Sequence, residues 1–521
     1  MTGKPSFYIT TAISYVNAAP HLGHAYEAIL TDVMARFKRL DGYDVMFLTG
    51  TDEHGEKVAN TAQQAGKTPE IFVDEIAAHF EKMCATLNIS NDDFIRTTQE
   101  RHHKASQALW RKIQANGDIY LDTYKGWYSV RDEAYVGDDE IETDENGNKF
   151  APSGAPVEWR EEPSYFFRLS AYTQDLLDFY EQNPAFIAPQ KRRNEVLSFV
   201  KGGLRDISIS RTGTRWGVPV PDDPDHVMYV WLDALTNYIT ALGYPDMSDS
   251  RFQTYWPANF HVIGKDITRF HAVYWPAFLM SAGIANPHQI FAHGFINVEG
   301  QKMSKSVGNV VAPDDLVGTF GCDQTRYLLV RETPHGQDGN FSAEHAIQRI
   351  NSDLANSIGN LAQRTLSMIY KNCNGKIPAG ENLQDEDWAL LNHAHEHLLP
   401  ALRTHFETFA LHKCMEEIIK LADAANSYID AQAPWVLKKE NPQRMGEVLY
   451  TLAETIRVIS IALQSAAPEG ASKILDQLNI PTEQRYFSHI NANNKLQSGQ
   501  TINKPEAAFP RLEMPEESRS A

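Results

Sequence analysis

The first fifty residues constrain the fold most strongly. Residues 6–13 (SFYITTAI) are rich in β-branched and aromatic side chains and predict a buried strand. Residues 21–42 repeat apolar side chains at helical spacing and end in a glycine, and residues 44–50 (DVMFLTG) predict a second strand. A strand, a helix and a strand of these lengths form a βαβ unit with parallel strands. Because ligands bind at the carboxyl ends of such strands, a site is expected where both strands end.

The rest of the chain divides by composition and periodicity. We expect a parallel-sheet domain in two halves, residues 1–115 and 226–300, around an inserted α+β subdomain of residues 116–225. Strand-like runs return after residue 226 as HVMYV, FHVIG and IFAHGFI, and they predict the second half of the parallel sheet. Residues 301–345 connect this sheet to residues 346–521, where apolar stripes on successive helical segments predict an antiparallel helix bundle.

Composition narrows the class of protein. The 521 residues contain no apolar run near the roughly 18 residues that a membrane span needs, and the N-terminus lacks a secretory pattern, so we expect a cytoplasmic protein without membrane contact. Taken alone, the net charge of −19 argues against a nucleic-acid binder, and no DNA partner is expected. Residues 190–216 nevertheless carry seven basic and two acidic side chains, so a basic patch on an acidic body remains open. Four scattered cysteines without a C-x-x-C pair exclude a disulfide framework and a cysteine-based zinc site.

Two short motifs suggest chemistry. His21 and His24 in PHLGH lie three apart, on one face of the predicted helix. They are either surface histidines at a helix start or part of a phosphate site, where free backbone N–H groups and the helix dipole attract anions. Lys302 and Lys305 of KMSKS suit the charge of a triphosphate, although a short basic loop taken alone is usually solvated surface.

Together, HLGH and KMSKS resemble the two nucleotide-binding signatures of the class I aminoacyl-tRNA synthetases. Further segments resemble the methionyl-tRNA synthetase family within that class: TAISYVNAAPHLGH, TGTDEHG, YVWLDALTNYI, IGKDITRFHAVYW, KMSKSVGN and the pair NLAQR and APW. The resemblance runs from about residue 7 to residue 470. It implies a Rossmann-like catalytic domain split by the insert, an anticodon-binding bundle, and a reaction in which methionine and ATP give methionyl-adenylate and pyrophosphate. Methionine then passes to the 3′ end of methionine tRNAs, both elongator and initiator.

The resemblance also implies roles around ATP. The catalytic residues would be His21, His24, Lys302 and Lys305, with the lysines stabilising the charge that develops as the methionine carboxylate attacks the α-phosphate. Asp266 would contact the ribose, and His293 would lie near the adenine. The implied ATP-binding residues are Asn17, His21, Gly23, His24, Asp266, His293, Lys302 and Lys305. Mg²⁺ is expected together with the ATP.

For methionine, the resemblance implies that Asp52 holds the ammonium group and that Arg211 closes over the site. The implied methionine-binding residues are Ala12, Ile13, Tyr15, Asp52, Trp231, Ala234, Tyr238, Ile267, His271 and Trp275. Leu235 departs from the family, because some members have a proline there. Taken without the resemblance, Asp52 also fits a turn or helix cap, and the aromatic stripe fits an ordinary core.

Asn360, Arg364 and Trp435 match the residues that read the anticodon in this family. Asn360 and Arg364 lie four apart and therefore share a helix face. An aromatic platform with nearby donors suits unstacked bases. The residues alone instead favour Trp435 as a buried cap of the bundle.

The insert lacks the zinc knuckles that many relatives carry there. Ser129 and Asp132 stand where paired cysteines would be, and residues 151–159 contain no cysteine, so no structural zinc and no other metal held by the insert is expected. The resemblance implies a monomer, because relatives that dimerise use an additional C-terminal domain. Three alternatives remain: a small-molecule adenylyltransferase, another class I synthetase, and a tRNA-binding paralogue without catalysis. KMSKS and the long helical region argue against the first, and the four intact catalytic residues argue against the last.

Overall fold

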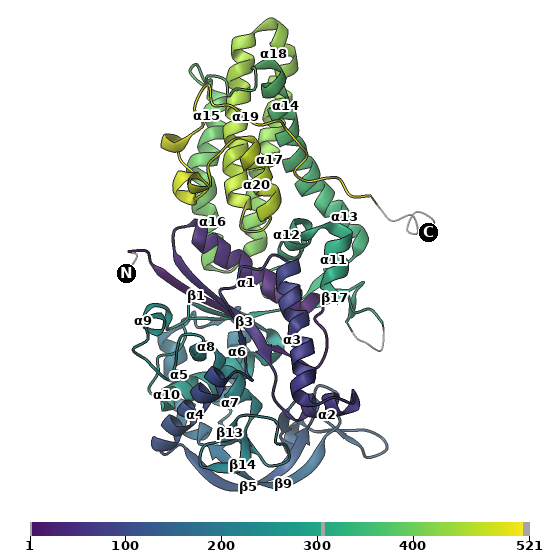
Figure 1. The fold of residues 1–521 in the computed structure, drawn as a ribbon, viewed down its shortest axis with the longest axis vertical. Coiled ribbons are helices and arrows are strands. Elements are labelled where there is room, and N and C mark those ends of the chain that lie inside the picture. Colours follow the sequence, from purple (N-terminus) through teal and green to yellow (C-terminus); the bar gives the residue numbers. More distant parts are fainter. Residues whose placement is uncertain (1–2, 304–307, 514–521) are drawn as a thin grey trace.

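The computed structural model describes residues 3–303 and 308–513. The molecule is elongated, with sheets and shorter helices in one half and a bundle of long helices in the other (Figure 1). A parallel sheet lies between the bundle and an antiparallel hairpin at the opposite end of the molecule. This arrangement agrees with the predicted fold class.

The parallel sheet begins with the predicted βαβ unit. Strand β1 (Ser6–Thr11) pairs in parallel with β3 (Asp44–Asp52), and helix α1 (Leu22–Leu40) connects them. The strand order is β10-β16-β15-β1-β3-β2, and β4 also pairs with β3. The bounds of the remaining strands are β2 (Ser14–Tyr15), β4 (Asp93–Arg96), β10 (Ile187–Ala188), β15 (Phe260–Gly264) and β16 (Ile290–His293).

One predicted strand of this sheet lies elsewhere. The segment HVMYV contributes to β14 (Asp223–Met228), which pairs antiparallel with β12 (Ser210–Arg211) and β13 (Pro219–Val220) in a separate sheet. Its apolar run is too short to cross the buried parallel sheet, because the chain turns into a helix directly after Tyr229. Conversely, β10 comes from the expected insert and joins the parallel sheet. The predicted boundaries between the insert and the two halves of the parallel-sheet domain therefore remain a prediction.

The insert is built on one long antiparallel hairpin. Strands β5 (Ile119–Ser129) and β9 (Glu158–Phe167) pair along ten residues, from Ile119 opposite Phe167 to Tyr128 opposite Glu158. They form a four-stranded sheet with β6 (Ala134–Val136) and β11 (Ile207–Ser208). This sheet lies at the end of the molecule farthest from the bundle (Figure 1).

Helices surround the sheets and connect them to the bundle. Those of the sheet half are α2 (Glu56–Gln64), α3 (Pro69–Thr86), α4 (Glu100–Ala115), α5 (Thr173–Gln182), α6 (Gln190–Lys201), α7 (Val230–Leu235), α8 (Asn237–Thr240), α9 (Ser250–Tyr255) and α10 (Trp275–Ser281). The connecting elements are β17 (Ile296–Val298), β18 (Gln301–Lys302), α11 (Pro313–Phe320), α12 (Cys322–Glu332) and β19 (Gly339–Phe341).

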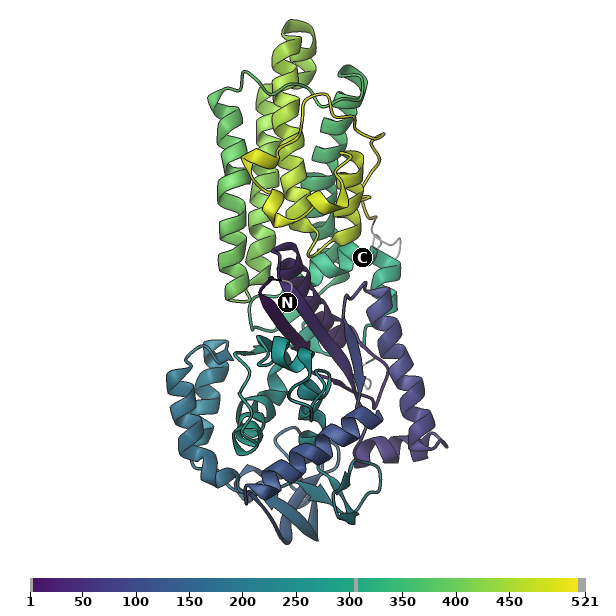
Figure 2. The same cartoon turned by 60° about the vertical axis from the view of Figure 1, so that its left-hand side comes forward.

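The predicted helix bundle is confirmed, and its long helices lie side by side in both views (Figures 1 and 2). Its helices are α13 (Ala343–Ile350), α14 (Leu361–Asn372), α15 (Asp385–Asn392), α16 (Leu398–Glu407), α17 (Leu411–Gln432), α18 (Pro434–Glu440), α19 (Pro442–Leu463) and α20 (Pro468–Gln477). Every residue of α19 from Arg444 to Leu463 is buried, so this helix forms the centre of the bundle. In the two described stretches of the chain, no helix is long and apolar enough to cross a membrane.

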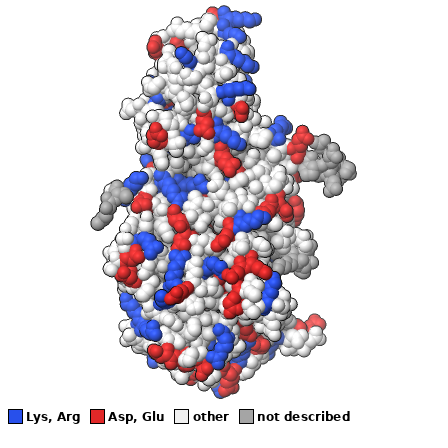
Figure 3. Space-filling view, in the orientation of Figure 1, with Lys and Arg blue, Asp and Glu red and all other residues white. Residues whose placement is uncertain are grey.

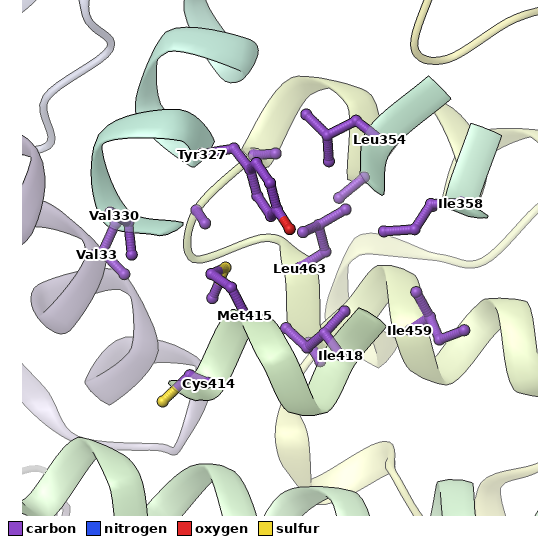
Figure 4. Packing of buried hydrophobic residues seen from close by; sticks show 14 of the residues in the cluster. Val33, Tyr327, Val330, Leu354, Ile358, Cys414, Met415, Ile418, Ile459 and Leu463 are labelled. Carbon is purple, nitrogen blue, oxygen red and sulfur yellow. The ribbon is translucent and has the colours of Figure 1, made fainter. Parts of the chain in front are cut away.

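Helix α1 belongs to the sheet and also packs against the bundle. Val33 of α1, Val330 of α12 and Met415 of α17 lie in one apolar cluster (Figure 4). The fully buried Asp32 of α1 and Arg326 of α12 form an ion pair with 2.6 Å between Oδ2 and Nη2. One hydrophobic core therefore continues from the sheet into the bundle.

Candidate active site

A cavity of about 810 Å³ opens at the carboxyl ends of β1 and β3. Ala12 follows β1 and Asp52 ends β3, and both residues line the cavity. The cavity therefore lies at the strand ends where the sequence predicts a ligand site. These predicted ATP and methionine residues line it: Ala12, Ile13, Tyr15, Asn17, His21, Gly23, His24, Asp52, Trp231, Ala234, Tyr238, Asp266, Ile267, His271, His293 and Lys302.

Three of the residues predicted around ATP and methionine are not in that set. Lys305 lies outside the described residues. Trp275 is fully buried behind the cavity, with its ring centroid 6.0 Å from that of Tyr238, which does line it. Arg211 is buried in β12, where its guanidinium lies 4.5 Å from the ring centre of Tyr229 and donates to the carbonyl oxygen of Ser210.

The HLGH segment forms a capped helix start. His21 is the N-cap of α1, and its Nδ1 accepts the N–H of Gly23 at 3.0 Å. The Nδ1 of His24 accepts the N–H of His21 at 3.1 Å. A Cβ on Gly23 would lie 2.9 Å from the ring of His21, so only glycine leaves room for this turn.

This capping corrects one expectation. Free backbone N–H groups at the start of α1 are expected to attract phosphate, but those of residues 21–24 already donate within the chain. Leu22 donates to Val311 O at 2.9 Å, Gly23 to the ring of His21, and both His24 and Ala25 to His21 O. What this turn offers to an anion is therefore the pair of imidazoles together with the helix dipole.

Hydrogen bonding also determines the neutral tautomer of His21 and His24. Because Nδ1 of each ring accepts a backbone N–H, a neutral ring carries its proton on Nε2. Burial, and then the neighbouring His21, lower the pKa of His24 well below its usual value, so this ring stays neutral. The ring centroids of His21 and His24 are 4.0 Å apart. The Nε2–H of each ring is suited to donate a hydrogen bond to a phosphate oxygen.

The two distant motifs meet at this turn. Met303 of KMSKS lines the cavity and lies 4.0 Å from the position that a Cβ of Gly23 would take. The backbone that follows KMSKS supplies Val311 O to cap Leu22. Lys302 lines the same cavity, with its Nζ 5.5 Å from the ring centre of Phe295. The fold therefore brings a lysine of the second motif to the histidines of the first.

Asp52 is a buried cavity residue with one carboxylate oxygen unpaired among the described residues. It is buried, and its Oδ1 accepts no hydrogen bond from any described residue. Burial, and then the neighbouring carboxylates of Asp233 and Glu133, raise the pKa of Asp52 well above its usual range. A buried acceptor that faces an open cavity without a partner fits a cationic ligand, such as an ammonium group.

A buried charge cluster lies behind Asp52. The two carboxylate oxygens of Asp233 lie 2.6 Å from Nδ1 of His54 and 2.7 Å from Nε2 of His102. Burial acts to raise the pKa of Asp233, but the two histidines outweigh it and hold that pKa below its usual range. The cluster keeps one carboxylate ionised next to Asp52 and thereby disfavours a second charge there.

The apolar end of the cavity is uncharged. His271 Nδ1 lies 3.1 Å from Ile267 O, and its Nε2 lies 2.7 Å from the hydroxyl of Tyr238. Burial lowers the pKa of His271 to about 4, so the ring is neutral, donating through Nδ1 and accepting through Nε2. The ring of Trp231 stacks on that of Phe270, with 3.7 Å between centroids. A neutral aromatic box of this kind suits a polarisable thioether.

The cavity contains functional candidates that sequence reasoning missed. Glu27 lines it, and its Oε2 lies 2.8 Å from Nε2 of His293. Burial alone would lower the pKa of His293, but its hydrogen bond with Glu27 raises it above the usual value. The signal was present in the sequence, because Glu27 follows His24 by three residues and therefore shares its helix face. Lys57 and Glu133 also line the cavity, without an equivalent sequence signal.

The predicted anticodon residues lie at the far end of the bundle. Trp435 is the second residue of α18 and has 45% of its surface exposed, so the expectation of a buried cap is wrong. The guanidinium of Arg364 lies 5.4 Å from the ring centre of Trp435 and pairs with Asp430 at 2.9 Å. Asn360 is exposed one turn before Arg364. Lys and Arg side chains gather along the edge formed by α14 and α18 (Figure 3).

The knuckle positions of the insert are joined by hydrogen bonds. Ser129 Oγ donates to Asp132 Oδ2 at 2.9 Å, and Ser153 donates to the same carboxylate. Arg131 donates to the carbonyl oxygen of Ser153 at 2.7 Å. Within residues 3–303 and 308–513, no group of three or more His, Cys, Asp or Glu side chains is arranged to hold a metal.

Comparison with known families gives two adjacent matches. Residues 7–366 match the family described as tRNA synthetases class I (M). Residues 377–520 match the anticodon binding domain of methionyl tRNA ligase. The two matches meet near the start of the bundle and together span almost the whole chain.

Curated relatives are similar over their full length. The methionine–tRNA ligase of Brucella suis is 55% identical over 508 residues, covering 98% of each chain. That of Rhizobium meliloti is 55% identical over 516 residues, covering 99% of this chain and all of the other. Among solved structures, Mycobacterium tuberculosis methionyl-tRNA synthetase in complex with methionyl-adenylate has a TM-score of 0.95 and 54% identity, covering 98% of this chain and 100% of that chain.

Proposed function

This chain belongs to the methionine–tRNA ligase family of class I tRNA synthetases, and from that premise we propose how its own residues divide the work. Members of the family activate methionine with ATP and then transfer it to tRNA, and this chain is such an enzyme. The observation that carries the residue assignment is the meeting of HLGH, KMSKS and the unpartnered Asp52 at one cavity.

Methionine binds with its ammonium group on Asp52 and its thioether in the neutral box of Trp231 and His271. The contact of ammonium with carboxylate leaves the methionine carboxylate directed toward the phosphate end of the cavity. The related structure with bound methionyl-adenylate supports this orientation, because the adenylate joins the two ligands at their reacting atoms. Binding both reactants in one cavity converts a bimolecular reaction into a local one.

The methionine carboxylate then attacks the α-phosphate of ATP, an acyl–O–P bond forms, and the bond to pyrophosphate breaks. His21 and His24 donate hydrogen bonds to phosphate oxygens, and Lys302 and Lys305 neutralise the negative charge that grows on the leaving pyrophosphate. Asn17 and Gly23 complete the phosphate end of the cavity. Asp266 and His293 hold the ribose and the adenine. No side chain acts as a nucleophile.

Mg²⁺ bound to the triphosphate adds positive charge that offsets the phosphate charge. Mg²⁺ is commonly held by substrate phosphates, several waters and one or two carboxylates, so it needs no dedicated cluster of protein ligands. The carboxylates of Glu27 and Asp266, which line the cavity, offer oxygen donors of the required kind.

In the second step, the 3′-terminal hydroxyl of a methionine tRNA attacks the adenylate carbonyl and AMP leaves. Asn360, Arg364 and Trp435 read the anticodon: Trp435 stacks on one base, and the other two side chains offer donors to base edges. The exposure of Trp435 and the nearby basic edge of α14 and α18 support this role. Arg211 closes over the methionine site, as the family resemblance implies. The enzyme works as a cytoplasmic monomer without structural zinc.

Amino-acid-dependent exchange of pyrophosphate into ATP tests the first step. We expect exchange with methionine only, among all twenty amino acids, and no exchange for the Asp52→Ala variant. Exchange that is stronger with another amino acid would contradict the assigned pocket. A methionine exchange that survives intact in Asp52→Ala would contradict the assigned ammonium site alone.

A further inference from the structure

One carboxylate of the insert reaches the methionine end of the cavity. Glu133 lies in the turn between β5 and β6, at the tip of the knuckle segment, and only 7% of its surface is exposed. Its φ of 49° is in the left-handed region, which non-glycine residues seldom adopt. The turn therefore holds a charged side chain inside the protein at a conformational cost, and the contacts of that side chain show what it stabilises.

Both carboxylate oxygens of Glu133 are engaged. Oε1 accepts the backbone N–H of Lys57 at 2.7 Å and the hydroxyl of Tyr15 at 3.1 Å. Oε2 accepts the hydroxyl of Tyr128 at 2.6 Å. The carbonyl oxygen of Glu133 accepts the hydroxyl of Tyr229 at 2.9 Å. Four donors from four separate parts of the chain therefore fix the side chain and backbone of this residue.

The contact with Lys57 caps a helix. Lys57 belongs to the first turn of α2, and the N-cap of α2 is Gly55, which has no side chain to supply an acceptor. A carboxylate at this end is favoured by the helix dipole. Gly55 also makes the arrangement possible, because a Cβ there would lie 2.8 Å from both Glu133 Oε1 and the Tyr15 hydroxyl oxygen.

The contact with Tyr15 leads to the substrate. Tyr15 lines the cavity and lies opposite Asp52 in the parallel pairing of β2 with β3. Its ring is also covered by Lys57, whose Nζ lies 5.3 Å from the ring centre and donates to Arg131 O at 3.0 Å. Residues 131–133 of the insert therefore hold the phenol directly at its oxygen and, through Lys57, at its face.

We propose that Glu133 is a positioning residue for the methionine pocket and acts through the hydroxyl of Tyr15. The proposal rests on the function given above, which places Tyr15 in that pocket. Anchoring the phenol before the ligand arrives lowers the entropy lost on binding, so the anchor favours methionine affinity. The insert thereby contributes to amino-acid binding, a task separate from holding its own sheet together.

The test is a double-mutant cycle on Glu133→Ala and Tyr15→Phe, measured by methionine-dependent pyrophosphate exchange. We expect each single change to raise KM for methionine roughly tenfold, with kcat and KM for ATP within about twofold, and the double variant to resemble the worse single one. Glu133→Gln keeps an oxygen acceptor and should retain much of the affinity. This milder variant also serves if the alanine variant does not fold.

Asp206→Asn is the matched control, because Asp206 accepts the hydroxyl of Tyr120 of β5 at 2.8 Å, away from the cavity lining. We expect unchanged kinetics from it. Additive effects in the cycle, an equal rise of KM for ATP, or a lowered melting temperature with unchanged KM for methionine would each overturn the proposal. If Tyr15→Phe alone leaves KM for methionine unchanged, Tyr15 does not contribute to the methionine pocket. A changed KM for methionine in the Glu133 variants would then show that Glu133 does not act through Tyr15.

Discussion

Under the proposed function, the cavity and the far end of the bundle would bind their ligands by opposite physical means. In the cavity, Asp52 is buried, and its Oδ1 lacks a hydrogen-bond partner among the described residues. A positively charged group of the ligand would supply that partner. At the end of the bundle, Trp435 is 45% exposed beside Arg364 and offers an aromatic face to a base. A small charged ligand is recognised when one buried partner replaces the water molecules around its charge. An RNA base is instead recognised by stacking on a surface that remains exposed to solvent. Changes at the first region should therefore affect every step, and changes at the second only steps that use tRNA.

Replacing Asp52 should have the largest effect. Asp52→Ala removes the partner of a buried ammonium group, which should cost about 3 kcal/mol or more of methionine affinity. Calorimetric titration with methionine measures it. Trp435→Ala should leave the same titration unchanged, and this pairing tests the independence of the two regions directly. Undiminished methionine affinity in Asp52→Ala would refute the assignment.

The Lys305→Ala change should separate rate from affinity within the cavity. A cation that acts on charge developing in the transition state contributes little to ground-state binding, so adenylate formation should slow roughly 10²-fold while methionine affinity stays nearly intact. Single-turnover adenylate formation and calorimetry measure the two quantities. A parallel loss of both would mean that this lysine shapes the cavity and has no specific role in the reaction.

The Trp435→Ala change should affect tRNA alone. Loss of one stacked base contact costs about 1–3 kcal/mol, so aminoacylation should become less efficient while pyrophosphate exchange without tRNA is spared. Trp388→Ala is a useful comparison, because Trp388 of α15 is similarly exposed, at 46%. If exchange falls together with aminoacylation, then Trp435 supports the fold and the contrast between the regions is lost.

Acidification should weaken methionine binding more gradually. Burial raises the pKa of Asp52 above its usual range, so the empty site holds a proton at pH values where an exposed aspartate has lost it. The ammonium group needs the carboxylate, and binding therefore releases this proton. Methionine affinity should decrease by up to about tenfold per pH unit as pH falls below the raised pKa. Calorimetry in buffers of different ionisation enthalpy counts the released proton, and a value of zero would contradict the scheme.

Chelation should have the smallest effect. The Ser129, Asp132 and Ser153 side chains already satisfy one another at the knuckle positions. We therefore expect a chelator to change neither the melting temperature nor adenylate synthesis once Mg²⁺ is restored. Elemental analysis that finds one tightly bound zinc per chain would show that the hydrogen-bonded knuckle was misjudged.

The sequence predicted the features that depend on local pattern. The βαβ unit, the long bundle helices and the position of the cavity follow from apolar periodicity and from strand ends, and the pocket residues follow from the family resemblance. The partners of the α1 N–H groups could not be foreseen, because Val311 O comes from a segment almost 290 residues away. The exposure of Trp435 depends on where α18 leaves the bundle, and the role of Glu133 depends on the packing of the insert against the sheet.

Helix α1 also fixes the distance between the histidines of the cavity and the contacts with α12 and the bundle. Its N-terminus carries the two histidines of the cavity, and further along it Asp32 is locked to Arg326 while Phe37 stacks on Phe406 of the bundle with 3.5 Å between ring centres. An α-helix rises about 1.5 Å and turns about 100° with each residue. One residue inserted between His24 and Asp32 would therefore swing the histidines away from the cavity or pull the ion pair apart. The residues between His24 and Asp32 can therefore change in identity, but their number has to stay the same.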